Sequence, residues 1–289
     1  KVKSLGRGSF GQAVLMRTAE GVSLVAKRMH LDSRSSLELV RLETEVAVCA
    51  KLRHPNICRY LGTVVRDEEV LICLEYAAGG TLFERIEVAA AASRPFACGL
   101  ATSWICGIAT GVSYIHSMNV LHRDLSSPNI FLSRADEIKV GDFGLSKASS
   151  SSLSGTTMCG TPNYFSPEMV NGSAYGTASD TWAVGLLAQE ILTLRHPFTW
   201  GSLSTPLALL FKRIQSCDYN EQRLLDAPYP AELKAIVSRS QLLHVEATKR
   251  LTLDEMLALP IFNCYRPSDP NVDANAPSEA VSSLGLWRA

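Results

Sequence analysis

The sequence lacks an excess of charge of either sign. Its 289 residues contain 28 Lys and Arg against 28 Asp and Glu, which gives a formal net charge of zero at pH 7. Proteins that bind nucleic acid or a membrane surface by electrostatic attraction usually carry an excess of basic residues. We therefore expect no nucleic-acid partner.

Long apolar runs and paired cysteine motifs are also missing. No stretch of 18 apolar residues occurs, so we expect no membrane insertion. The eight cysteines are scattered without a Cys-x-x-Cys pair, which argues against a structural zinc site. In a chain of this length, scattered cysteines indicate reduced thiols. We therefore expect an intracellular, cytoplasmic location, which is compatible with cytoskeletal or nuclear association.

The chain does contain two regions of different pattern. Short apolar runs bounded by turn residues predict five strands at 2–5, 12–17, 23–29, 60–65 and 69–74, with one helix at 37–52. Helical spacing then dominates, at 82–92, 101–118, 178–194, 207–216, 231–243 and 253–258. We divide the chain into a small lobe at 1–76, a larger lobe at 77–262, and a poorly ordered tail at 263–289.

A glycine-rich segment lies near the start of the chain. Gly6, Gly8 and Gly11 match the pattern Gly-x-Gly-x-x-Gly. A dinucleotide-binding turn would need a helix after the glycines, whereas residues 12–16 have a strand pattern. The alternatives are a simple hairpin turn or a loop between two strands that lies over phosphates. We favour the phosphate loop, because glycine lets backbone amides approach an anion closely.

A lysine and an acid in the small lobe fit the same chemistry. Lys27 lies on a predicted strand 16 residues after Gly11, and Glu45 lies in the predicted helix. Glu43 is an alternative partner, but the helix stop at 54–56 favours Glu45. A lysine paired with a carboxylate keeps its charge and is oriented to bind phosphate oxygens.

Three further polar residues carry the strongest signal in the chain. Asp124 and Asn129 belong to the segment His-Arg-Asp-Leu-Ser-Ser-Pro-Asn, and Asp142 follows in Asp-Phe-Gly. Each could be an ordinary turn residue. Together they suit phosphoryl transfer: Asn129 and Asp142 offer the hard oxygen ligands that Mg²⁺ prefers, and Asp124 can accept a hydroxyl proton.

With these motifs in this order, residues 1 to about 262 resemble eukaryotic protein kinases. Within that family the chain looks most like NIMA-related serine/threonine kinases, on the segments 129–132, 160–162, 166–168 and 192–198. The resemblance implies a bilobal α+β fold, in which a five-stranded antiparallel sheet with one main helix faces a larger helical lobe. It also implies transfer of the γ-phosphoryl group of ATP to Ser or Thr of a protein substrate. Mg²⁺ would be the metal, with Mn²⁺ as a substitute.

The resemblance further implies roles for residues that would otherwise be read as core. Leu5, Val14, Ala26 and Phe131 would enclose the adenine, Glu75 and Ala77 would offer it backbone hydrogen bonds, and Leu74 would be the gatekeeper. Thr161 would favour serine and threonine substrates. Glu168 would pair with Arg250, and Asp180 lies in the kinase-like Ser-Asp-x-Trp segment.

One position departs from the family pattern. Serine/threonine kinases usually have lysine two residues after the catalytic Asp, where this chain has Ser126. A unit charge about 4 Å away is worth roughly 1 to 4 kcal/mol, or roughly 5- to 1000-fold in rate. Two interpretations follow: an active serine/threonine kinase, or a weakly active or inactive kinase-like domain that serves as a nucleotide-binding scaffold.

The segment between Asp142 and Glu168 resembles an activation loop. Thr157 is our candidate for the main phosphorylation site because it lies four residues before Thr161, and Thr156 is its neighbour. Arg123 could pair with a phosphate group there and order the loop. An upstream kinase or self-phosphorylation would supply the phosphate. The alternative is a solvated polar loop without a regulatory role.

Overall fold

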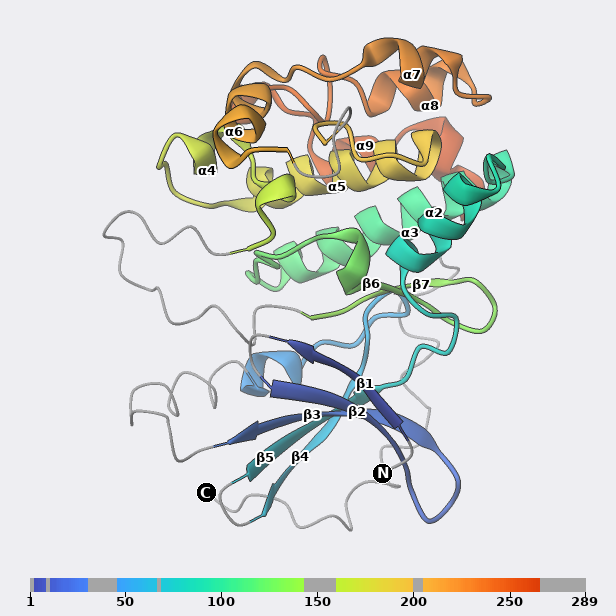
Figure 1. Cartoon of the computed structure of the whole chain (residues 1–289), viewed down its shortest axis with the longest axis vertical. Helices are drawn as coiled ribbons and strands as arrows, with labels where there is room; N and C mark the ends of the chain where they lie inside the picture. The colour runs from blue at the N-terminus through green and yellow to red at the C-terminus, as the bar shows by residue number, and fades with distance from the viewer. Residues whose placement is uncertain are drawn as a thin grey trace.

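The structure is a computed structural model that describes residues 3–8, 11–30, 46–66, 69–142, 160–199 and 205–265. A sheet forms one end of the molecule and helices form most of the other (Figure 1). The predicted α+β class is thus confirmed. The predicted tail lies outside the described residues from 266 onward, as do residues 31–45, which contain most of the predicted small-lobe helix.

The small lobe contains the five predicted strands. They are β1 (Lys3–Gly8), β2 (Gly11–Arg17), β3 (Ser23–His30), β4 (Tyr60–Arg66) and β5 (Glu69–Glu75). The order is β1-β2-β3-β5-β4, and every neighbouring pair is antiparallel. Residues 46–49 are helical and belong to the end of the helix predicted before β4.

Two segments connect the sheet to the larger lobe. The segment before β4 forms a parallel bridge between Ile57 and Val140, with the Cys58 amide donating to the Val140 carbonyl at 2.8 Å. The other segment follows β5, where the Gly79 amide donates to the Leu132 carbonyl at 2.8 Å. A Cβ atom on Gly79 would lie 2.4 Å from a backbone oxygen, so this approach requires glycine.

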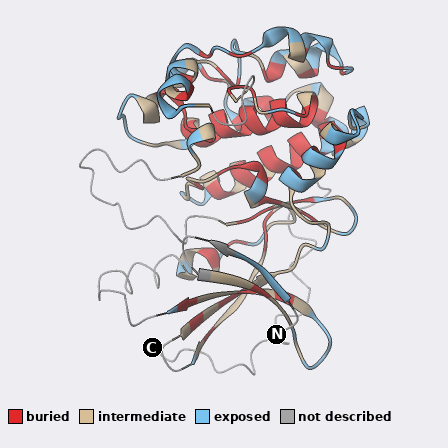
Figure 2. Ribbon diagram, in the orientation of Figure 1, coloured by how far each residue is buried: buried red, intermediate tan, exposed pale blue. Residues whose placement is uncertain are grey.

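The larger lobe is built on two long buried helices, α3 (Cys98–Ser117) and α5 (Thr177–Thr193), which Figure 2 colours mostly red. Around them lie α2 (Leu82–Ala91), α4 (Pro167–Val170), α6 (Leu207–Ser216), α7 (Glu221–Asp226), α8 (Ala231–Ile236) and α9 (Leu253–Leu257). A small hairpin of β6 (Ile130–Leu132) and β7 (Ile138–Val140) faces the sheet lobe. Short 3-10 turns lie at Ser127–Asn129, Pro162–Tyr164, Ala247–Lys249 and Pro260–Tyr265.

Helix α3 is long and apolar enough to cross a membrane by composition alone, but it is a core helix of this lobe. It has 20 residues, and 61% of its most apolar window is buried inside the protein. Its buried side chains include Trp104 and Ile108, which belong to the large hydrophobic core.

One helix prediction differs from the structure, and two short helices were not predicted. The helix predicted at 231–243 ends at Ile236, and α4 and α7 were missed. Polar groups take the backbone amides that would continue α8: the Arg239 amide donates to the Tyr219 hydroxyl, and the Ser240 amide donates to the Ser238 hydroxyl. Such local hydrogen bonds compete with the helical pattern.

Candidate active site

The glycine-rich segment forms the β1–β2 hairpin. Gly8 pairs with Gly11 across the two strands, and Gly6 pairs with Ala13. A Cβ atom on Gly6 would meet no other atom within 4 Å. The fold itself therefore leaves space beside this glycine, which is the space that a phosphate group over the hairpin would need.

Strand register decides which side chains share a face with Lys27. Successive residues of a strand point to opposite faces, so Ala26 faces away from Lys27, and Val14 pairs directly with Ala26. Both are fully buried in a cluster with Leu24, Val64 and Cys73.

The assignment of Val14 and Ala26 to the adenine is therefore corrected. Ala13 pairs with Lys27 and Val25 lies two residues before it, so these partly exposed residues share the lysine's face. Leu74 pairs with Val25 and lies on the same face. The sequence pattern could have revealed this, because side chains two residues apart on a strand lie on one face.

The other residues predicted around the adenine lie on β1, on β5 and the segment that follows it, and on β6. Leu5 is an exposed bulge residue of β1. Phe131 lies on β6, and a Cβ atom on Gly141 would come within 2.7 Å of its ring. Ala77 follows β5, and the Glu75 carboxylate accepts from the Arg59 amide at 3.1 Å and from Lys139 at 3.0 Å.

Lys27 contacts Asp142 directly, which joins the sheet lobe to the segment that follows β7. The ammonium group forms an ion pair with the Asp142 carboxylate. Burial lowers the pKa of Lys27 to about 8, and the nearby Asp124 carboxylate opposes that shift. Asp142 has a φ of 59°, a left-handed conformation that non-glycine residues adopt rarely. Glu45 and Glu43 lie outside the described residues.

Asp124 lies between Thr161 and Asn129. Its Oδ1 atom accepts from the Thr161 amide at 3.1 Å and from the Thr161 hydroxyl at 3.2 Å. Its Oδ2 atom accepts from the Asn129 amide group at 3.2 Å, and that group also donates to the Asp124 carbonyl at 2.8 Å. The Gly141 amide donates to the Asn129 carbonyl at 3.1 Å, which places Asn129 beside the residue that precedes Asp142. Four predicted residues therefore meet at one place.

The backbone of this loop is attached to the buried carboxylate of Asp180 on α5. Oδ2 accepts from the His122 amide at 2.9 Å and from His116 Nε2 at 2.8 Å, while Oδ1 accepts from the Arg123 amide at 3.2 Å. Burial alone would raise the pKa of Asp180, but these donors hold it below the ordinary value. The carboxylate is therefore charged at neutral pH.

Glu168 and Arg250 form the predicted pair. Arg250 donates to both carboxylate oxygens, at 3.0 and 3.1 Å, and its own side chain is 1% exposed. The guanidinium also lies over the Trp182 ring, 5.1 Å from its centre. The pair joins α4 to the segment before α9.

A second buried acid was missed in the sequence because nothing marks it within an apolar helix. Tyr164 donates to both Glu190 oxygens at 2.8 Å, and the Ser127 amide donates to the Tyr164 hydroxyl at 3.1 Å. Burial raises the pKa of Glu190 to about 7. Ser127 belongs to the loop of Asp124, so this network fixes the loop from a second side.

The Glu190 acid should make stability depend on pH. Its folded pKa is raised above the ordinary 4.5, so its contribution is fully present below pH 4.5 and is lost as the pH rises through about 7. Relative to Glu190→Gln, the wild type should lose on the order of 3 kcal/mol of unfolding free energy over that window. Urea unfolding at a series of pH values measures it. Glu232→Gln, at an exposed site, is the control, and parallel curves for wild type and Glu190→Gln would refute the assignment.

The replacement at Ser126 lies inside the loop. Ser126 is buried, and its side chain makes no capping hydrogen bond to the 3-10 turn that follows. Thr156 and Thr157 lie outside the described residues. Among the described residues, no group of three or more His, Cys, Asp or Glu side chains gathers as a metal site. The residues predicted to hold a metal are Asp142 and Asn129, whose carboxylate and amide oxygens are ligands that Mg²⁺ prefers.

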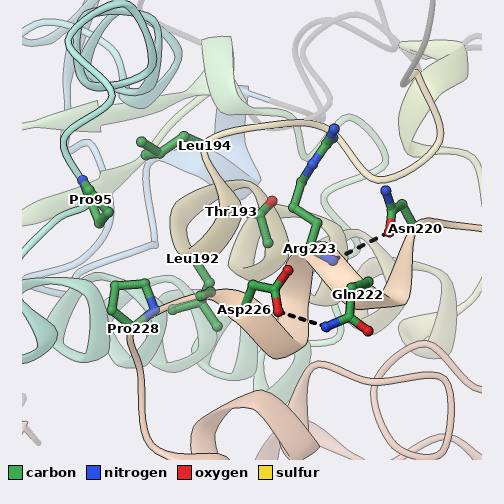
Figure 3. Close-up of a pocket in the computed structure, with 10 residues that line it drawn as sticks. Pro95, Leu192, Thr193, Leu194, Asn220, Gln222, Arg223, Asp226 and Pro228 are labelled. Carbon is green, nitrogen blue, oxygen red and sulfur yellow. Dashed lines mark hydrogen bonds between the residues drawn. The ribbon is translucent and has the colours of Figure 1, made fainter.

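A separate cavity of about 330 Å³ lies at the C-terminal end of α5 against α7 (Figure 3). Several of its polar side chains already have partners, since Gln222 donates to Asp226 at 2.6 Å and Asn220 accepts from the Arg223 amide at 3.3 Å. None of the predicted site residues lines this cavity. We assign it no part in the chemistry.

Comparisons with known proteins point to one family. The model of the protein kinase domain family matches residues 1–262. The serine/threonine-protein kinase Nek9 of Mus musculus is 36% identical over 267 residues, which is 92% of this chain and 26% of that protein. Nek1 of Mus musculus is 35% identical over 205 residues, or 70% of this chain and 17% of that protein. The probable serine/threonine-protein kinase nek3 of Dictyostelium discoideum is 32% identical over 286 residues, which is 95% of this chain and 25% of that protein. The chain thus spans about a quarter or less of these relatives.

Proposed function

Because this chain belongs to the protein kinase family, among relatives named as Nek serine/threonine kinases, we propose that it transfers the γ-phosphoryl group of ATP to Ser or Thr hydroxyls of proteins. The observation that carries the proposal is the meeting of Lys27, Asp124, Asn129 and Asp142 in one place. An ordinary structural loop would not need a proton acceptor, two oxygen ligands and a buried cation together.

Each residue has a definite part in the reaction. Asp142 and Asn129 would bind Mg²⁺, which neutralises charge on the phosphates when it is bound. Lys27 would bind phosphate oxygens, and Ala13, Val25, Leu74 and Phe131 would enclose the adenine, with backbone groups at Glu75 and Ala77 as its hydrogen-bond partners. These residues fit the nucleotide, because the lysine, the carboxylate and the open space beside Gly6 lie on one side of the sheet.

Asp124 would act on the substrate hydroxyl. The hydroxyl oxygen forms a bond to the γ-phosphorus, the bond from that phosphorus to the bridging oxygen of the diphosphate breaks, and the hydroxyl proton passes to Asp124. Thr161 fixes Oδ1 through two hydrogen bonds, which orients the carboxylate. The products are ADP and a phosphorylated protein.

The alternative is a weakly active or inactive nucleotide-binding scaffold. The observation in its favour is Ser126, which is buried and uncharged where the family usually has a lysine. Lys27 and a bound Mg²⁺ would still neutralise most of the charge on the phosphates. We therefore favour an active enzyme whose rate is lowered by this replacement.

Transfer of radiolabelled phosphate to a generic Ser/Thr protein substrate tests the proposal. Wild-type protein with ATP and Mg²⁺ should label the substrate, and Asp142→Asn, which weakens the metal site, should not. Melting temperature with and without ATP and Mg²⁺ is measured on the same samples. No labelling together with stabilisation by ATP would favour the scaffold, and no labelling without stabilisation would contradict the nucleotide site.

Regulation through the loop between Asp142 and Glu168 belongs to the same proposal. We infer that Thr157, with Thr156 beside it, is phosphorylated by an upstream kinase or by the enzyme itself, and that Arg123 pairs with the phosphate. In the same assay, phosphatase treatment should lower wild-type activity to the level of Thr157→Ala. If phosphatase leaves wild-type activity unchanged, Thr157 is not the switch.

The remaining assignments are proposals of the same kind. We place the boundary between lobes after residue 76, and the end of the larger lobe at residue 262. An intracellular, cytoplasmic location is supported by the seven cysteines of the described residues, which form no disulfide bond.

A further inference from the structure

The Asp180 carboxylate has a fourth donor that sequence analysis did not identify. Tyr175 lies between α4 and α5, and its hydroxyl donates to Oδ1 of Asp180. The same oxygen accepts from the Arg123 amide at 3.2 Å, and Oδ2 accepts from His116 Nε2 and from the His122 amide. We propose that Tyr175 is a positioning residue for phosphoryl transfer: its hydroxyl fixes Asp180 and thereby the backbone turn that presents Asp124.

The hydroxyl is suited to this part because it remains a donor. Burial, followed by the negative charge of Asp180, raises the pKa of Tyr175 well above its ordinary value. A phenol that stays protonated can donate a hydrogen bond to a buried carboxylate at neutral pH. Hydrogen bonds to a charged acceptor are also stronger than neutral ones.

The backbone that Asp180 holds is strained at one residue. Arg123 has a φ of 68°, in the left-handed region, and it directly precedes Asp124. Such a conformation persists only where its surroundings determine it by several contacts. The Arg123 amide makes the longer of the two backbone hydrogen bonds to Asp180, at 3.2 Å against 2.9 Å for the His122 amide. Tyr175 therefore acts at the point where the turn is held least tightly.

The effect should reach the reacting carboxylate through the chain. Asp124 follows the strained residue, and the His122 ring contacts the Gly141 carbonyl at 2.9 Å, next to Asp142. A turn that relaxes at Arg123 would move Asp124 relative to the substrate hydroxyl. Lys27 and the residues of β2, β3 and β5 proposed to enclose the adenine belong to the sheet lobe, whereas the turn at Arg123 belongs to the larger lobe. The KM for ATP should therefore change less than kcat.

The test compares Tyr175→Phe with Tyr229→Phe. Tyr229 is also buried, and its hydroxyl donates to the Phe96 carbonyl at 3.0 Å in another part of the lobe. Tyr175→Phe should lower kcat about tenfold, equivalent to about 1.4 kcal/mol. The KM for ATP should stay within about twofold, and Tyr229→Phe should leave kcat unchanged. Equal kcat values for the two variants would overturn the proposal.

A second measurement does not depend on activity. This inference rests on the proposed transfer, so a wild-type protein without activity would refute the function first. Hydrogen exchange of the His122 and Arg123 amides still tests the geometry: it should be about tenfold faster in Tyr175→Phe than in wild type or Tyr229→Phe. Equal exchange rates would overturn the positioning role. If Tyr175→Phe does not fold, unprotected exchange of the Arg123 amide in the wild type would also overturn it.

Discussion

Replacing Asp124 by asparagine should lower kcat by about 10²- to 10⁴-fold, the usual contribution of a general base. Asparagine keeps an oxygen that can accept from Thr161, and the Asn129 amide group keeps its hydrogen bond to the backbone carbonyl of residue 124, although it loses the one to Oδ2. The amide cannot accept a hydroxyl proton. The KM for ATP should change by less than about threefold. Steady-state kinetics with a Ser/Thr protein substrate measures both values.

The control for Asp124→Asn is Asp218→Asn, which makes the same chemical change at an exposed position after α6. It should leave kcat unchanged. If Asp124→Asn lowers kcat by less than about threefold, Asp124 does not accept the proton. The proposed mechanism would then need another base.

Replacing Arg250 by methionine should lower the free energy of unfolding by about 3 to 5 kcal/mol, because it leaves the Glu168 carboxylate without its partner. Arg250 is almost fully buried and satisfies both oxygens of that carboxylate. Chemical denaturation measures the loss. Arg85→Met is the matched control: its pair with Asp136 is about one-third exposed, so it should cost about 1 kcal/mol or less.

The stabilisation by the pair of Arg250 and Glu168 should also depend on pH. Arg250 holds the pKa of Glu168 below 4.5, even though burial acts in the opposite direction. The stabilisation is therefore present above pH 4.5 and is lost as the pH falls through the folded pKa.

The double variant Arg250→Met with Glu168→Gln should recover part of the loss. If it is no more stable than Arg250→Met alone, the cost does not come from the unpaired carboxylate.

The fold was largely predictable from the sequence. The five strands and the main helices all follow from apolar periodicity and from turn residues. The helix predicted at 231–243 was too long, because hydroxyl groups of Tyr219 and Ser238 take its later amides. Periodicity alone does not report such competing donors and acceptors.

The site residues were predictable where a sequence motif marks them. They were not predictable where their role depends on packing against residues distant in the sequence. The spacing of the motifs singled out Lys27, Asp124 and Asp142. The motifs alone do not assign faces: Ala26 lies on the face opposite Lys27, because neighbouring residues of a strand point to opposite sides of the sheet. No sequence motif marks Tyr175 or Glu190, and only their contacts with distant residues reveal what they do.

The attachment of the catalytic loop to α5 has a consequence for how the protein is made. Asp180 follows His122 by 58 residues, and Arg250 follows Glu168 by 82. During synthesis the loop that carries Asp124 leaves the ribosome well before the helix that holds it. A nascent chain that ends before Asp180 therefore has every residue proposed to bind nucleotide or transfer phosphate, but it lacks the anchor that shapes the loop. Catalytic competence should thus appear only after α5 has been synthesised and has folded into the core.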